Sequence, residues 1–347
     1  TIKNVVAGDR LQENPDANSV EAIGRLPGVS VNRNSGEGSG IVVRGLSSKY
    51  TAVTLNGVRM AGTGADGRET NISGISQYSL EGVEVFKAIT ADMDGNSVAG
   101  TVNLKLRETP KDLYVNVMST SGYNSLNNDV SNFKFLAESG TRFFEDKLGV
   151  FGSFNLESAN RSAQTMSAGY DSAPSTDPSR QVDLLINNTG LNLKDLIKKR
   201  MSAMVNLDYR LGSKTKLGLY GLYNRSHDEL ENQTKNYSAT GSGGVSYGFN
   251  QNNDGLAELF QSSLSGVTTL NFMKIDYGIT YSGAQTDNPN SRSWGFTTQR
   301  PQDLINTPLT QDLRRTLQPT DVPLLYDDNT NAINSFVMTS LEVASEN

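Results

Sequence analysis

Three segments of this chain alternate apolar and polar residues over lengths typical of a membrane-spanning β-strand. Apolar residues or glycine recur at every second position from Leu148 to Leu156, from Met201 to Leu211 and from Met273 to Tyr281. The positions between them include charged residues such as Asp208 and Lys274. Charged side chains on the inner face of a packed β-sandwich would be costly, whereas a water-filled lumen accommodates them. The alternation therefore favours an antiparallel transmembrane β-barrel.

Weaker alternating segments raise the expected number of strands to about seven. These weaker segments lie at residues 112–122, 131–142, 216–227 and 292–300. Short connections are expected at Glu145–Asp146, Gly212–Ser213 and Asp287–Asn290, and long ones at 159–200, 228–268 and from 301 onward. Tight periplasmic turns that alternate with long extracellular loops are typical of outer-membrane barrels. Because lipid does not tolerate bare sheet edges, an odd set of strands cannot close, and we expect only part of a barrel here.

The composition excludes several other classes of protein. The 347 residues contain no apolar run near the roughly 20 residues that a membrane-spanning helix requires. There is no cysteine, which excludes disulfide frameworks and thiolate metal sites. The formal charge of -6 and the absence of a basic run argue against nucleic acid, whose binding depends on clustered Lys and Arg.

Residues 1–110 predict a small α+β domain ahead of these strands. Asn18 and Glu21 have the spacing of a helix N-terminal capping box, and Pro27–Gly28 would end a helix of about two turns. Asn56–Gly57 predicts a tight hairpin turn, because both residues tolerate positive φ. Short strands are expected near residues 29–31, 41–44, 53–55, 83–86 and 102–106, with the glycines of NSGEGSG connecting the first two.

Five motifs of this domain occur in the order found in the plug domain of TonB-dependent outer-membrane receptors. They are Pro27-Gly28-Val29, Arg44-Gly45, Leu55-Asn56-Gly57, Val83-Glu84-Val85 and Gly100-Thr101-Val102-Asn103. The chain resembles this family. It departs from the common V-E-V-x-x-G-P pattern, because Lys87-Ala88-Ile89-Thr90 followed by ADMDGNSVAG stand there, a variant of SusC-like or related receptors. The resemblance implies a mostly β protein with an α+β plug at residues 1–110. Residues 111–347 would then be the first third of a transmembrane antiparallel barrel of about 22 strands.

The resemblance also implies roles for individual residues. Arg44 and Glu84 match positions whose side chains contact charged partners on the barrel wall, and their alternative role is that of solvated strand-end charges. In this family the upper loops of the plug form the floor of the ligand chamber. Four residues of these loops are candidate ligand contacts or, equally, ordinary surface side chains: Lys49, Tyr50, Arg68 and Tyr78.

The implied function is TonB-dependent active import of a scarce or bulky nutrient across the bacterial outer membrane, without enzymatic chemistry. The partners would be outer-membrane lipid, the TonB–ExbB–ExbD complex, a small-molecule, glycan or peptide ligand, and a SusD-like surface lipoprotein or other outer-membrane proteins. One alternative is a structural or assembly component of a larger outer-membrane complex that transports nothing, and a soluble β-sandwich enzyme is a third hypothesis. The substrate does not follow from the fold, since one scaffold serves many ligands.

Several other motifs are better explained as turns and loops. Gly62–Gly67 matches G-x-G-x-x-G, but no amphipathic helix follows it. Gly244–Gly248 matches G-x-S-x-G in a loop-like context without a strand-to-helix elbow. The single histidine, His227, is expected to cap the outer end of a strand. Residues 191–201 predict either a short amphipathic helix or a loop segment on the barrel rim.

No metal or organic cofactor is expected, apart from a calcium ion that one loop could bind. Asp92, Asp94 and Asn96 have the spacing of the start of a calcium loop. The bidentate Glu that would complete such a loop is replaced by Asn103, so a solvated turn is the alternative.

Overall fold

A computed structural model describes residues 3–12, 18–63, 68–88, 95, 97–125, 128–174, 182–238, 244–270, 272–299 and 336–343. These residues divide into two compact units. The first unit comprises residues 1–160, 198–227 and 256–287, and the second comprises residues 161–197, 228–255 and 288–347.

The N-terminal domain of the first unit contains a mixed five-stranded sheet in the order β1-β6-β7-β4-β5. Its strands are β1 (Lys3–Ala7), β4 (Thr51–Leu55), β5 (Val58–Arg59), β6 (Leu80–Phe86) and β7 (Gly100–Leu106). β4 and β7 are parallel, whereas the other neighbours are antiparallel. A separate antiparallel hairpin is formed by β2 (Val29–Asn34) and β3 (Glu37–Val43). The sheet ends at Leu106 and the next strand begins at Tyr114, so the chain changes sheets between these residues.

Four short helical segments accompany these strands. They are α1 (Gly8–Gln12), α2 (Ser19–Ile23), η1 (Ser48–Tyr50) and η2 (Gln77–Ser79). Within the described residues, no helix has the length and apolar character needed to cross a membrane.

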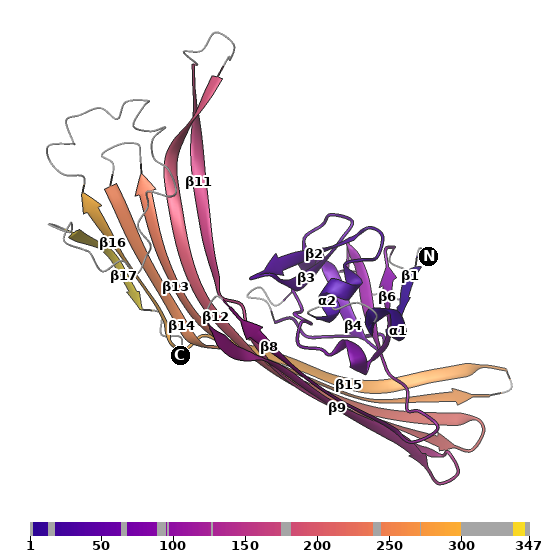
Figure 1. The fold of residues 1–347 in the computed structure, drawn as a ribbon. Coiled ribbons are helices and arrows are strands. Elements are labelled where there is room, and N and C mark those ends of the chain that lie inside the picture. Colours follow the sequence, from indigo (N-terminus) through magenta and orange to yellow (C-terminus); the bar gives the residue numbers. More distant parts are fainter. Residues whose placement is uncertain are drawn as a thin grey trace. The chain divides into compact units, whose positions relative to one another are not determined.

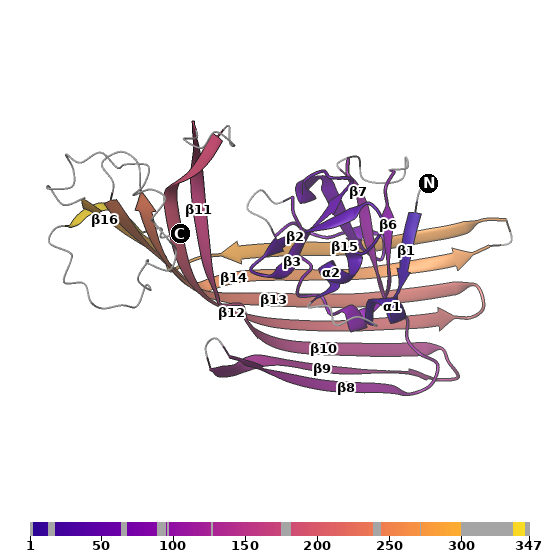
Figure 2. The ribbon, with the colours of Figure 1, turned by 45° about the horizontal axis from the view of Figure 1, so that its top comes forward.

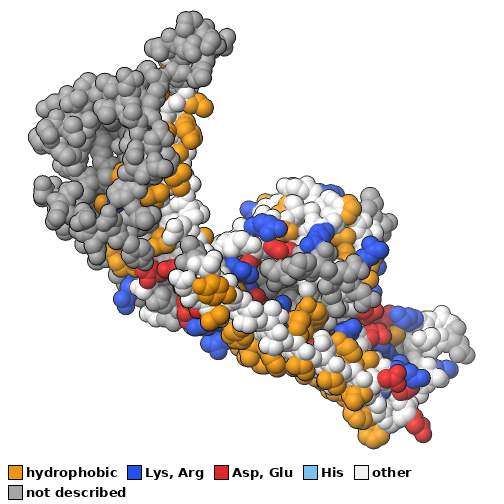
Figure 3. All heavy atoms as spheres, viewed as in Figure 1, with side chains coloured by type: hydrophobic (Ala, Val, Ile, Leu, Met, Phe, Trp, Pro, Cys, Tyr) orange, Lys and Arg blue, Asp and Glu red, His pale blue; other side chains and the backbone are white. Residues whose placement is uncertain are grey.

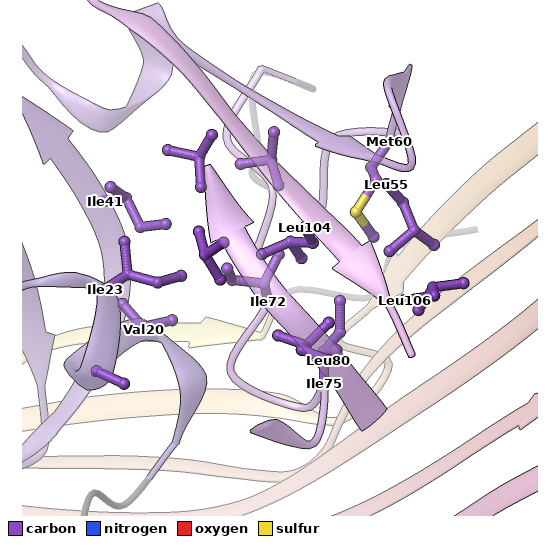
Figure 4. Close-up of a cluster of buried hydrophobic side chains, with 14 of the residues drawn as sticks. Val20, Ile23, Ile41, Leu55, Met60, Ile72, Ile75, Leu80, Leu104 and Leu106 are labelled. Carbon is purple, nitrogen blue, oxygen red and sulfur yellow. The ribbon is translucent and has the colours of Figure 1, made fainter. Parts of the chain in front are cut away.

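Apolar side chains from the helices, strands and connecting loops form the core of this domain (Figure 4). Val20 and Ile23 of α2 face Ile41 of β3, and Leu104 of β7 lies near Ile72. All five side chains are at most 4% exposed. Burial of a large aliphatic side chain stabilises a fold by about 2 kcal/mol, so this cluster explains why such a small domain is ordered.

Two local predictions for this domain are confirmed. The Asn18 side chain accepts a hydrogen bond from the backbone N–H of Glu21 and caps α2, although the helix is shorter than predicted. Asn56 and Gly57 have φ angles of 50° and 84° and join β4 to β5 as a tight hairpin turn. The prediction for NSGEGSG was wrong in extent, because only Ser35–Gly36 forms the turn and β3 already begins at Glu37.

A long antiparallel sheet follows the N-terminal domain (Figures 1 and 2). In the first unit it contains β8 (Tyr114–Asn124), β9 (Asp129–Phe143), β10 (Leu148–Asn160) and the first-unit parts of β12 (Val182–Leu211), β13 (Thr215–Ser238), β14 (Gly244–Thr269) and β15 (Lys274–Asp287). Each strand pairs with the next in this order. We call these seven first-unit strands the wall.

The predicted alternation of the wall is confirmed by burial. On β10, Phe151 and Ser153 are buried, whereas Phe154 is exposed. On the wall part of β12, Met204 and Asp208 are buried, whereas the odd-numbered positions from Met201 to Leu211 are half-buried or exposed. Figure 3 shows apolar side chains gathered on the face of the β8–β9 region that points away from the N-terminal domain. The apolar face therefore points outward, and the polar face meets the N-terminal domain.

β15 is exposed over most of its length, so burial does not distinguish its two faces. Its pairing with β14 shows which side chains point outward. Ile279 pairs with Leu264 of β14, and both side chains are more than half exposed. Thr280 instead donates a hydrogen bond to Ser263, which is buried. The apolar residues of β15 thus share the outward face.

Three predictions about the strands and loops of the long sheet were wrong. Residues 244–269, assigned mostly to a long loop, form β14, and their Gly-, Asn- and Ser-rich composition concealed the strand. Residues 191–201 lie in β12 and not in a helix or loop, because strand pairing overrides their helical propensity. The region 287–290 does not reverse the chain, since β15 and β16 (Ser291–Gln299) both pair antiparallel with β14.

The remaining turns are consistent with this topology. Residues 144–147 join β9 to β10, with positive φ at Phe144, Glu145 and Asp146. Gly212, at φ 66°, begins the turn between β12 and β13. His227 lies within β13 and not at its end, because the strand continues to Ser238.

The second unit contains the remaining strands of the long sheet. β11 (Ala163–Pro174) pairs with the first part of β12, and β16 pairs with β14 and with β17 (Phe336–Val343). The predicted long loops at 159–200 and 228–268 are therefore largely extended strands.

Candidate functional site

A buried ion pair joins the N-terminal domain to the wall. Glu37 of β3 accepts hydrogen bonds from both Nη atoms of Arg200 on β12, and Arg200 Nη1 also lies 3.6 Å from Glu157 Oε2 on β10. The side chains of Glu37 and Arg200 are 3% and 2% exposed. Separation of such a buried pair would leave a buried charge without a partner, which is costly. The pair therefore holds β3 firmly against β12.

A second contact involves the η2 turn. The hydroxyl oxygens of Ser79 and Ser153 of β10 lie 2.6 Å apart, and both side chains are buried. Lys134 Nζ of β9 lies 5.8 Å from the ring centroid of the neighbouring Tyr78. Tyr78 is thus half-buried beside the wall, and its predicted role as a ligand contact stays a prediction.

A third contact joins the end of β4 to β13 and β14. The Tyr220 hydroxyl donates to the carbonyl oxygen of Leu55 over 3.3 Å and accepts from Gln261 Nε2 over 2.9 Å. Farther along, Ala61 N–H donates to Ser282 Oγ on β15 over 3.0 Å. These contacts connect one edge of the N-terminal domain to β13 and β15, and Gln261 of β14 supports the Tyr220 hydroxyl from within the wall.

A polar cluster lies where the chain passes from β7 into β8. Arg107 donates to the Tyr114 hydroxyl over 2.9 Å, and its guanidinium stacks over the same ring at 4.7 Å. The buried carboxylate of Glu138 on β9 accepts from Asn116 and lies 4.0 Å from Arg107. Asn206 of β12 donates to the Arg107 carbonyl oxygen. The domain is therefore fastened to the wall at its C-terminal end as well.

A polar hollow of about 460 Å³ lies between the Asn56–Gly57 turn and strands β12, β13 and β14. Its lining includes Asn103, Lys105 and the ion pair of Lys216 with Glu108, whose charged atoms are 3.5 Å apart. The hollow shows that water-sized space exists between domain and wall on this side.

The two predicted wall-contact residues make their contacts within the N-terminal domain. Arg44, at φ 55°, donates through Nε and Nη2 to the Ala99 carbonyl oxygen at 3.2 and 3.0 Å. Glu84 lies 2.7 Å from Lys3 Nζ and 3.0 Å from Lys105 Nζ. On the described wall strands, neither residue has a contact of the predicted kind, and that role stays a prediction. The observed wall contact is made instead by Glu37.

Glu84 is strongly biased toward its charged form. Burial by itself would raise the pKa of Glu84, but hydrogen bonds from Lys3, Asn103 and Lys105 outweigh burial and lower the pKa from 4.5 to about 2. The same contact raises the pKa of Lys105. Three strands, β1, β6 and β7, are thereby joined at one carboxylate.

The other predicted ligand residues lie on exposed parts of the N-terminal domain. Lys49 and Tyr50 are adjacent in η1, with Lys49 Nζ 5.2 Å from the Tyr50 ring centroid, and both are exposed. Arg68 is also exposed. Their ligand contacts stay predictions.

The structure does not describe the proposed calcium loop. Asp92, Asp94 and Asn96 lie outside the described residues, as does most of the Gly62–Gly67 motif. In the part of the chain that is described, no group of three or more His, Asp or Glu side chains is arranged to hold a metal ion.

Sequence reasoning missed the Glu37–Arg200 pair for two local reasons. Glu37 lies in the glycine-rich NSGEGSG segment, which was assigned to a turn, and Arg200 lies in the segment assigned to a helix or loop. The available signal was Glu37 itself, a single carboxylate between glycines next to a predicted strand. If such a carboxylate is buried, it requires a cation as its partner.

Comparisons with known proteins agree with the architecture of the N-terminal domain. Residues 1–101 match the model of the TonB-dependent receptor plug domain. A segment of 105 residues is 30% identical to the vitamin B12 transporter BtuB of Vibrio vulnificus strain YJ016 and covers 29% of this chain and 17% of that protein.

Solved structures of similar proteins were also found. The ferric enterobactin receptor PfeA of Pseudomonas aeruginosa is 13% identical, with a TM-score of 0.47 over 85% of this chain and 48% of that one. The siderophore receptor PirA of Acinetobacter baumannii is 12% identical, with a TM-score of 0.40 over 87% of this chain and 59% of that one. The chain thus spans less than two thirds of the length of each of these relatives.

The N-terminal domain is a plug domain of the TonB-dependent receptor type, placed against the polar face of a partial barrel sheet. Proteins with this plug are outer-membrane β-barrel receptors and transporters rather than enzymes, which agrees with the predicted class and location. We refer to the domain as the plug from here on.

Proposed function

We propose that this chain is the plug and the first wall strands of a TonB-dependent importer that moves a nutrient across the bacterial outer membrane. The observation that supports this most directly is the contact of the plug with the polar face of the wall, whose opposite face is apolar. An apolar outward face suits lipid, and a polar inward face suits a lumen that can fill with water. BtuB, which is similar to a segment of 105 residues of this chain, is named a vitamin B12 transporter.

The contacts between plug and wall suit a plug that can be displaced. Ser79 with Ser153, Tyr220 with Leu55, and Ala61 with Ser282 are neutral hydrogen bonds, whose groups water can satisfy after separation. Each contributes only about 1 kcal/mol net. The buried Glu37–Arg200 pair and a few apolar wall side chains, such as Phe151 and Leu222, add the larger resistance.

The N-terminal strand offers a place where a pull would act first. β1 lies at the edge of the plug sheet and pairs only with β6 in that sheet. A force applied ahead of Lys3 would therefore reach the β1–β6 pairing and the Lys3–Glu84 ion pair before the rest of the plug.

A reversible tether tests whether the plug must move. The two hydroxyl oxygens of Ser79 and Ser153 are close enough that paired cysteines should form a disulfide between plug and wall. Because the sequence contains no cysteine, Ser79→Cys with Ser153→Cys would be the only pair in these residues. We expect TonB-dependent uptake to stop in oxidised cells and to return after reduction. Labelled cyanocobalamin, ferric enterobactin and neutral oligosaccharides serve as the uptake probes.

The matched control is a tether within the wall. Thr215 of β13 and Thr268 of β14 have hydroxyl oxygens 3.2 Å apart, so paired cysteines there would join wall to wall and leave the plug free. This control should transport in both redox states. Uptake that persists with the plug tethered, or that is unchanged in cells without TonB, would contradict the proposal.

A further inference from the structure

The sheet of the second unit has an aromatic face. Phe249 of β14 and Trp294 of β16 are directly opposite in the register, and their rings stack with centroids 4.1 Å apart. On β13 and β14, Lys235 Nζ lies 5.3 Å from the ring centroids of both Tyr237 and Tyr247. Because side chains alternate along a strand, these residues share one face of the sheet.

The opposite face is rich in amides and hydroxyls. A side chain at Gly190 of β12 would meet the Asn236 amide oxygen of β13, and one at Gly248 of β14 would meet the Thr234 hydroxyl. These contacts and the pairing register of β14 with β16 place the even positions of β12, β13 and β14 on the same face as the odd positions of β16. We call this set the amide face: Asn192, Asn232, Thr234, Asn236, Asn250 and Ser293.

An open groove of about 280 Å³ crosses the amide face. Asn232, Thr234, Asn250 and Ser293 line the groove together with Gly248 and Gly295. The volume lies at the lower end for small-molecule sites, so the groove fits a small ligand or one segment of a longer one.

The groove has hydrogen-bonding capacity and no charge. None of its lining residues is ionisable. The amide oxygen of Asn232 is buried and has no hydrogen-bond partner among the described residues. Lys194 occupies an even position of β12 near this face, but it does not line the groove and has an interaction partner of its own.

We propose that this groove binds a neutral, hydroxyl-rich ligand of the saccharide class. An asparagine amide both donates and accepts, and a threonine or serine hydroxyl does the same, so this set can satisfy the adjacent hydroxyl groups of a sugar ring. A phosphate or carboxylate ligand would instead require a cation or several converging N–H donors. Use of the groove to capture a solute for import rests on the proposed function, whereas saccharide binding itself does not.

The test is binding of defined oligosaccharides to the full-length protein in a detergent without a sugar headgroup. Maltohexaose, cellohexaose and xylohexaose are the neutral probes, a galacturonate hexamer is the anionic probe, and purified lipopolysaccharide tests a membrane glycan as the source. Calorimetry measures affinity.

Asn232→Leu and Asn250→Leu each remove an amide at similar volume, and we expect each to weaken binding of the neutral probe about tenfold. Gln251→Leu is the matched control, because Gln251 is adjacent in β14 and points to the other face. It should leave affinity unchanged.

The outcomes separate this inference from the proposed importer. Binding that depends on Asn232 and Asn250 supports the saccharide site even if TonB-dependent uptake is never observed. Displacement of the oligosaccharide by lipopolysaccharide assigns the same site to a membrane glycan, whereas lack of displacement assigns it to a soluble solute. Failure of every neutral glycan to bind, preference for the anionic probe, or wild-type affinity in both asparagine variants overturns the inference.

Discussion

Arg142 on β9 and Asp208 on β12 form an ion pair across the strand that lies between them. Arg142 Nη2 is 3.0 and 2.8 Å from the two carboxylate oxygens of Asp208, and both side chains are almost fully buried. The two residues meet over Gly149 of β10, which pairs with Arg142 in the register. The missing side chain at Gly149 is what makes room for this contact, since a Cβ there would collide with the Asp208 carboxylate.

Substitution of Gly149 by valine is therefore expected to separate the pair and reduce the yield of folded protein. Separation would leave two buried charges unpaired, a cost of about 3 kcal/mol or more. The fraction that migrates as folded protein in unheated gels measures the effect. Gly221→Val is the control, because Gly221 lies on a wall strand with open space around its Cα, and it should fold normally. Equal folding of the two variants would contradict this account.

Neutralisation of Glu37 should loosen the plug from the wall. Glu37→Gln keeps the shape but leaves Arg200 with Glu157 as its remaining carboxylate, so we expect a loss of about 3 kcal/mol in the free energy of plug release. Hydrogen exchange of β3 amides, followed by mass spectrometry, measures local opening.

Asp276→Asn is the matched comparison for this variant. It removes the exposed Lys274–Asp276 pair, which is 60% exposed at both side chains, and should cost less than about 1 kcal/mol. If the β3 amides exchanged at the wild-type rate in Glu37→Gln, the buried pair would not hold the plug to the wall.

Local signals in the sequence were sufficient for much of the fold. Asn18 and the Asn56–Gly57 turn each depend on side-chain and backbone chemistry within a few residues, and both were predicted at the right positions. The alternation around Phe154 and Val205 was equally clear, because one face of each strand meets the plug and the other does not. Such signals do not depend on distant partners.

The site depended on partners far apart in the sequence. Glu37 and Arg200 are 163 positions apart, and neither has a local pattern that names the other. β14 was missed because its buried positions include Gln261 and Ser263 in place of apolar residues, and Gln261 donates to the Tyr220 hydroxyl that itself contacts the plug. Where plug and wall meet through polar side chains, the sequence therefore lacks the apolar–polar alternation that predicts a strand.

The cap of α2 should be a measurable source of plug stability. Asn18→Ala removes the hydrogen bond from the Glu21 N–H and also the one donated to the Gly38 carbonyl oxygen at 2.9 Å. We expect the free energy of unfolding of the plug to fall by about 1 to 2 kcal/mol, as measured by calorimetry. Asn18→Asp retains the acceptor for the cap and should recover part of the loss. Equal Tm values for Asn18→Ala and Asn18→Asp would contradict the capping role of Asn18.

The stability of the plug should depend on pH through Glu84. Its pKa in the folded protein is about 2, below the usual 4.5, so the unfolded chain binds a proton more readily than the folded one. The stabilisation is fully present above pH 4.5 and is lost as the pH falls from 4.5 through 2. Calorimetry across this range should show the Tm of the plug transition falling with pH, and Glu84→Gln should flatten that dependence.

Two comparisons identify Glu84 as the source of this dependence. Glu81 lies three residues earlier on β6 and is exposed, so Glu81→Gln should retain the wild-type pH profile. Added salt should also weaken the Glu84 contribution, because Lys3 and Lys105 are 39% and 49% exposed and their attraction to Glu84 is partly screened. If Glu84→Gln kept the full pH slope between pH 4.5 and 2, the strand junction of β1, β6 and β7 would not depend on this carboxylate. A flattened slope would show that the charge on Glu84 holds the N-terminal strand to the plug.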